Sequence, residues 1–148
     1  ENKNYLTMSW FSKNKQDANF ESLETSVATL LIHAARLDEN YSPNEKLTIN
    51  KCLVQLGFGE NDKVEKLIDR CEALEKESNQ ILHLTQEIKK LKYTDRLKII
   101  EVLVEVVYAD GKMDEFEDNL IRRVCGLVYV ENADVGTIKE NIKKKLTL

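Results

Sequence analysis

The sequence contains two related acidic segments, Asp38-Glu39-Asn40-Tyr41-Ser42-Pro43-Asn44-Glu45 and Asp110-Gly111-Lys112-Met113-Asp114-Glu115-Phe116-Glu117. They are called here the first corner (residues 38–45) and the second corner (residues 110–117). Asp38 and Asp110 are 72 residues apart, and so are Glu45 and Glu117. Apolar runs precede both corners, and apolar residues at periodic spacing follow both. An apolar helix, an acidic turn and a second helix, repeated once, predict a pseudo-twofold helical domain.

Apolar residues recur at helical spacing through most of the chain, so the fold class is predicted to be all-α. About seven helices with short connections are expected, covering residues 21–37, 43–56, 61–77, 79–91, 95–107, 115–128 and 134–145. The helices of residues 20–56 and 95–128 are predicted to superpose by a twofold rotation. A single helical domain is expected over residues 18–148, after a segment, residues 1–17, that we interpret as a mobile end or a short docking helix.

The segment of residues 99–107 is open to two interpretations. Its many β-branched residues favour a strand. Its counterpart in the repeat, residues 28–37, is rich in Ala and Leu, which favour a helix. We therefore predict a central, mostly buried helix. The residues expected to pack together around the pseudo-axis are Leu31, Ala34, Leu53, Val102, Leu103 and Val106.

Composition excludes several classes of function. The net charge of −4 provides no concentrated basic surface, so no nucleic-acid partner is expected. No apolar stretch approaches the roughly 20 residues that span a bilayer, although a peripheral association with a membrane is left open. Cys52, Cys71 and Cys125 lie among apolar residues without metal-ligand spacing, which predicts buried, reduced thiols and a cytoplasmic protein. The sequence does not set the oligomeric state.

The two corners carry the residues with functional potential. Hard cations such as Ca²⁺ need several oxygen ligands from one short loop. Asp110, Asp114 and Glu117 provide three carboxylates within eight residues, and Gly111 permits a tight turn. The first corner is poorer, with the carboxylates of Asp38 and Glu45 beside neutral oxygens.

Helix capping explains part of the same pattern without a metal. Ser42-Pro43-Asn44-Glu45 has the form of a capping box, with Ser42 as the N-cap and Glu45 bonding back to it. Asp114 to Glu117 fits the same pattern with an Asp cap. Capping does not explain why an Asp stands seven positions before each Glu.

The second corner and the helix before it, Val106-Val107-Tyr108-Ala109-Asp110-Gly111-Lys112-Met113-Asp114-Glu115-Phe116-Glu117, resemble the tellurite-resistance TerB family. The resemblance covers roughly residues 20–145 and implies an all-helical, pseudo-symmetric core whose acidic positions bind a divalent cation, calcium being the expected one. By that resemblance the metal ligands are Asp110, Asp114 and Glu117 in one half, and Asp38 and Glu45 in the other. The first corner departs from the family pattern, because Glu39 follows Asp38 where the family has Gly.

Two functions of different classes follow. One is a non-enzymatic, metal-binding helical module that acts as a protein-interaction adaptor in a bacterial stress response, with a protein partner that the sequence does not identify. The other is a metal-free helical scaffold whose corners only cap helices. An enzyme is not expected, because the sequence offers no Ser/His/Asp or Cys/His arrangement and no Gly-rich phosphate loop.

Overall fold

The computed structural model of the chain describes residues 20–37, 41–77, 81–109, 111 and 115–146. Seven α-helices and one 3₁₀-helix lie within this part of the chain, and it contains no strand. They are α2 (Phe20–Arg36), α3 (Pro43–Gln55), α4 (Asn61–Glu77), α5 (Ile81–Thr85), η2 (Ile88–Lys90), α6 (Tyr93–Val107), α7 (Glu115–Leu127) and α8 (Asn132–Lys145). The all-α prediction is confirmed. The N-terminal segment of residues 1–17 lies outside the described residues.

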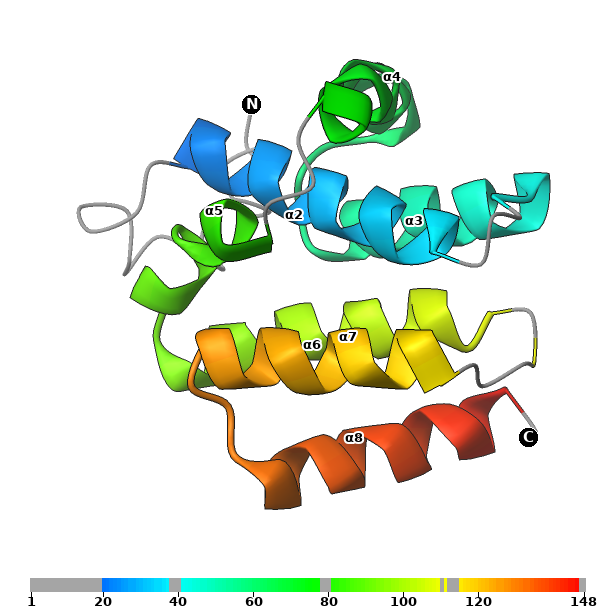
Figure 1. Cartoon of the computed structure of the whole chain (residues 1–148). Coiled ribbons are helices and arrows are strands. Elements are labelled where there is room, and N and C mark those ends of the chain that lie inside the picture. The colour runs from blue at the N-terminus through cyan, green and yellow to red at the C-terminus, as the bar shows by residue number, and fades with distance from the viewer. Residues whose placement is uncertain (1–19, 38–40, 78–80, 110, 112–114, 147–148) are drawn as a thin grey trace.

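Two central helices, α2 and α6, pack against each other, and the other helices pack around them. Helix α2 also contacts α3, α4 and α5, whereas α6 also contacts α7 and α8. In Figure 1, α2 and α6 both run from left to right, while α3 and α7 return from right to left. The two helices that precede the corners therefore have their carboxyl ends on the same side of the molecule.

Residues 99–107 form part of α6, so the helical interpretation is correct and the strand alternative is wrong. Seven apolar residues of this segment are buried, and only Glu101 is exposed. A helix that is apolar on nearly all sides is stable only when neighbours cover it on all sides. Burial between α2, α7 and α8 therefore outweighs the preference of β-branched residues for strands. All six residues predicted to form the centre of the core are buried in one apolar cluster.

The helix bounds follow the sequence repeat closely. Helices α3 and α7 have 13 residues each, and both their first and last residues are 72 positions apart. Phe58 N–H donates to Leu53 O at 3.1 Å, and Val130 N–H donates to Cys125 O at 3.0 Å, in the same positions after the two helices. Both ends are Schellman caps. The exact rotation that relates the halves stays a prediction.

One predicted helix is wrong. Residues 79–91 were expected to form one helix, but α5 ends at Thr85 and η2 follows at Ile88–Lys90. The bonds of Gln86 N–H to His83 O and of Lys90 N–H to Glu87 O span three residues and tighten the chain there. The tighter path keeps both Ile88 and Leu91 in the core. Sequence periodicity could not show this break, because buried residues recur every three or four positions on either path.

Truncation of Leu103 tests the central packing. Leu103 is fully buried in α6, so L103A should lower the free energy of unfolding by about 2–5 kcal/mol. Urea denaturation measures this loss. The control is L47A, because Leu47 is 69% exposed and its truncation should cost less than about 0.5 kcal/mol. Equal losses in the two variants would contradict the assignment of Leu103 to the core.

The caps after α3 and α7 generate a second prediction. Gly57 has φ 85° and Tyr129, at the equivalent position, has φ 59°. The left-handed conformation strains every residue with a Cβ, and the Tyr129 side chain is 68% exposed. Y129G should therefore raise the free energy of unfolding by roughly 0.5–1 kcal/mol, after allowance for the greater freedom of glycine in the unfolded chain.

The matched variant is G57A, which should lower stability by roughly 1 kcal/mol because it introduces the same strain at the other cap. Urea denaturation of both variants provides the comparison. If Y129G destabilises the protein, the Tyr129 side chain contributes more than its conformation costs and the prediction is wrong.

Candidate functional site

The structure describes two of the five predicted metal ligands. Glu45 lies in the first turn of α3 and Glu117 in the first turn of α7, and each is 1% exposed. Asp38, Asp110 and Asp114 lie outside the described residues. Ionised carboxylates are rarely so buried without hydrogen-bond donors or cations around them. The two equivalent glutamates are therefore both buried, at equivalent positions of the two corners.

The first corner has a complete capping box. Ser42 is extended, with φ −81° and ψ 159°, and precedes Pro43, the first residue of α3. Glu45 N–H donates to Ser42 Oγ at 3.1 Å, and Ser42 N–H donates to Glu45 Oε1 at 2.9 Å. The capping prediction is confirmed here. Glu45 stabilises the start of α3 through this bond, whatever else it does.

A network of charged side chains fastens the first corner to α4. Tyr41 Oη donates to Glu72 Oε2 at 2.9 Å, and Lys46 Nζ lies 3.1 Å from the same oxygen. The Arg36 guanidinium lies over the Tyr41 ring, 5.1 Å from its centroid, and donates to Glu75 and to Glu72 O. Burial, and then the bond to Glu72, raises the pKa of Tyr41, so its hydroxyl remains a donor.

The charges of this network balance one another. The side chains of Arg36 and Lys46 reach the first corner from α2 and α3. Their acidic partners, Glu75 and Glu72, come from α4 and form ion pairs with them. Opposite charges at such short distances largely cancel, so the network by itself neither favours nor opposes a cation near Glu45.

The second corner has a different environment. Tyr108, which is buried, takes the place of Arg36 at the end of the preceding helix. Gly111 has φ 77° and its N–H donates to Tyr108 O at 3.0 Å, which confirms the tight turn predicted at this glycine. Asp118, in the first turn of α7, forms ion pairs with Arg122 and Lys139, at 3.4 and 2.7 Å.

His33 and Glu105 occupy equivalent positions in the repeat. The hydrogen bond of each side chain runs to the third helix of its own half. His33 Nδ1 lies 3.2 Å from Glu75 Oε2 on α4, and Lys145 Nζ of α8 donates to Glu105 Oε1 at 3.2 Å. Each of these two residues thus forms a polar contact between a central helix and a helix that covers it.

Within the described residues, no three His, Cys, Asp or Glu side chains converge as a metal-binding group. Because the three aspartates lie outside that part of the chain, this finding does not test the corners. Sequence reasoning missed the role of Glu72, Glu75 and Tyr41. An acidic stripe at Asp69, Glu72 and Glu75, which runs from the exposed side of α4 onto its buried face, is the signal that could have revealed it.

The fold and its corners define an all-α domain built from two helix–turn–helix units with a buried glutamate at the start of each second helix. Comparison with protein families gives this class a name. The family model of tellurite resistance protein TerB matches residues 24–140, so the chain belongs to the TerB family. Searches of curated proteins and of solved structures found no match. In the described part of the chain, every helix is too short or too polar to span a lipid bilayer.

The N-cap at Ser42 can be tested by a pair of substitutions. S42A should lower the free energy of unfolding by about 1 kcal/mol, within a range of 0.5–2, because it removes the acceptor for Glu45 N–H. S42G should cost only a few tenths of a kcal/mol, because glycine is tolerated at an N-cap. Thermal or urea unfolding measures both. A larger loss for glycine than for alanine would indicate that Ser42 is not acting as a cap.

Proposed function

We propose that this chain is a non-enzymatic TerB-like module whose second corner binds a divalent cation, with calcium as the first candidate. The observation that carries the proposal is the position of Glu117, a carboxylate only 1% exposed in the first turn of α7, next to the tight turn at Gly111. The proposed ligands are Asp110, Asp114 and Glu117. Three carboxylates and main-chain carbonyls suit a hard cation.

The second corner is proposed in preference to the first because it has three carboxylates against two, and affinity for a hard cation rises with the number of charged ligands. At the first corner Glu45 Oε1 already accepts from Ser42 N–H. The first corner, with Asp38 and Glu45, would therefore bind a cation more weakly or not at all.

A metal-free scaffold is the second candidate function. The capping box at Ser42 and Glu45 favours it, because that geometry explains a buried glutamate without any cation. If the second corner works in the same way, Glu117 is a structural residue. The domain would then contribute only its helical surfaces to an assembly.

The proposed role of the module is that of an adaptor between proteins in a bacterial stress response. A cation that orders a corner changes the surface that this corner presents, and a partner can detect such a change. Three buried cysteines support a reducing, cytoplasmic location, since each of Cys52, Cys71 and Cys125 is a free thiol. Burial raises the pKa of Cys125 to about 11, so its sulfur stays protonated and unreactive.

Replacement of Asp110 tests the cation. Calcium at 100 times its dissociation constant should stabilise the wild-type protein by about 2.7 kcal/mol, because it binds only the folded state. For a chain of this size that corresponds to a rise in melting temperature of roughly 5–10 °C. D110N should abolish this rise and leave the melting temperature in EDTA nearly unchanged.

The matched control is D38N, which makes the same substitution at the equivalent position of the first corner and should retain most of the calcium effect. Differential scanning calorimetry with and without calcium measures all three proteins. If wild-type protein stripped of metal shows no shift at millimolar calcium, the corner does not bind calcium and the scaffold function is favoured.

A further inference from the structure

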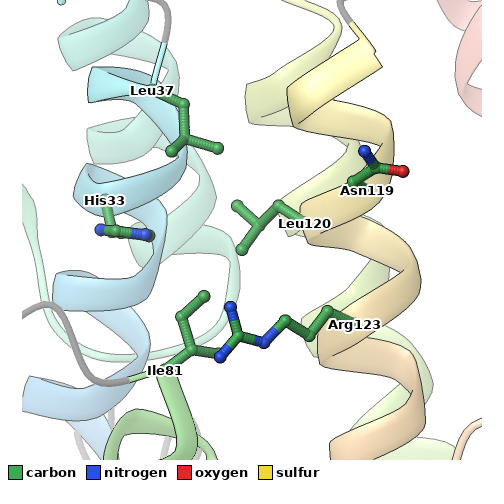
Figure 2. Close-up of a pocket in the computed structure, with 6 residues that line it drawn as sticks. All are labelled: His33, Leu37, Ile81, Asn119, Leu120 and Arg123. Carbon is green, nitrogen blue, oxygen red and sulfur yellow. The ribbon is translucent and has the colours of Figure 1, made fainter.

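A cleft separates the two halves of the bundle on the side of α2 and α7. Its volume is about 200 Å³, and it is lined by His33, Leu37, Ile81, Asn119, Leu120 and Arg123. Figure 2 shows His33 on α2 and Leu37, just after α2, facing Asn119, Leu120 and Arg123 on α7, with Ile81 at one end of the cleft. A ligand in this cleft would touch both halves.

The wall of the cleft has an apolar part. Ile81 and Leu120 are each 5% exposed and belong to the hydrophobic core, and Leu37 packs against that core. Their side chains offer a surface for a short aliphatic group. Pockets in helical bundles commonly combine such a surface with a few polar groups that orient the ligand.

Asn119 and Arg123 are the hydrogen-bond donors of the cleft. Asn119 Oδ1 accepts from Arg122 at 3.4 Å, which leaves the Nδ2 donors of the amide. Figure 2 shows the nitrogen of Asn119 on the cleft side and its oxygen on the far side. His33 Nδ1 lies 3.2 Å from the Glu75 carboxylate, and Nε2 of a neutral ring that donates there is an acceptor, so His33 is not one of the donors.

Arg123 is the strongest of these donors. Arg36, Arg96 and Arg122 bond to carbonyl or carboxylate oxygens, whereas Arg70 and Arg123, both exposed, form no hydrogen bond or ion pair with another described residue. Of these two, only Arg123 lines the cleft. Its side chain extends from α7 across the cleft, and the guanidinium ends near Ile81 (Figure 2). Glu75, the carboxylate that bonds to the lining residue His33, is also bonded to Arg36. The cleft therefore presents one unmatched positive charge beside an apolar wall.

We propose that this cleft binds a carboxylate on a short aliphatic stem. The planar guanidinium of Arg123 matches a carboxylate with two parallel hydrogen bonds, and the Asn119 amide adds a third donor. A volume of 200 Å³ corresponds to roughly six or seven waters of liquid, which admits an acid of about five carbons. A free organic acid and the C-terminal residue of a peptide share this chemistry.

The test uses two probes and their neutral counterparts. The probes are valerate and a tripeptide that ends in leucine with a free carboxylate; the counterparts are valeramide and the same tripeptide as its C-terminal amide. Chemical-shift titration of the whole chain in EDTA measures the dissociation constants, so that the result is independent of any cation at the second corner. At least one probe should bind, with shifts at residues of α2 and α7, and its neutral counterpart should bind at least about tenfold more weakly.

Three variants assign the binding to Arg123. R123Q should weaken it by about tenfold to a hundredfold, the usual effect of losing charge-assisted hydrogen bonds. R123K should have an intermediate effect, because lysine keeps the positive charge but lacks the planar guanidinium that forms two parallel hydrogen bonds. R70Q is the matched control, since Arg70 is an exposed arginine on α4 outside the cleft, and it should bind like wild type.

Binding of valerate alone would identify a free acid as the ligand, and binding of the tripeptide alone would identify a peptide C-terminus. The proposal would be overturned if neither probe binds at about 20 mM. This concentration is on the order of the dissociation constant expected for the weakest binding that such contacts provide. Equal weakening by R123Q and R70Q would also overturn the proposal, because the effect would then come from net charge. Unchanged circular dichroism and melting temperature establish that each variant is folded.

Discussion

The packing of α2 against α6 is the contact on which the other elements depend. Both helices are buried along most of their length, from Leu23 to Ala35 and from Ile99 to Tyr108. A helix of this kind leaves no face for water, so each one must be covered by its neighbours. Helices α3, α4 and α5 provide that cover in the first half, and α7 and α8 provide it in the second. The corners arise where the chain leaves each central helix to begin the covering helices.

The covering helices are joined to the central pair by polar contacts in which the carboxylates, Glu75 and Glu105, are buried, whereas Lys145 is about half exposed. His33 and Arg36 bond to Glu75 of α4, and Glu105 bonds to Lys145 of α8. Such pairs cost desolvation energy, so their larger effect is to set the register of one helix against another. The two halves use different residues for the same purpose, and the difference matters at the corners. The first corner is enclosed by a dense network of charges, whereas the second has a buried tyrosine and a glycine turn.

The sequence predicted the fold class and helix bounds closely because helix periodicity and capping are local properties. The capping box at Ser42 and the glycine turn at Gly111 could be predicted for the same reason. The break between α5 and η2 could not be predicted, since buried residues follow similar spacing in one continuous helix and in two short ones. The network around Tyr41 was missed because it joins residues 26 to 39 positions apart, and no local pattern pairs them. For the candidate site, the sequence located both glutamates but could not say that each would be 1% exposed.

By itself the sequence determined that this chain is all-α, that it repeats a helix, an acidic corner and a second helix, and that its acidic residues concentrate at those corners. These properties follow from residue type and spacing along the chain. Only the tertiary structure decided which charges meet. It placed Arg36 and Lys46 at the first corner, paired Lys139 with Asp118 near the second, and left Arg123 across a cleft between the halves. The physical reason is that electrostatic and packing energies depend on distance in space, and that distance is set by how α2 and α6 pack.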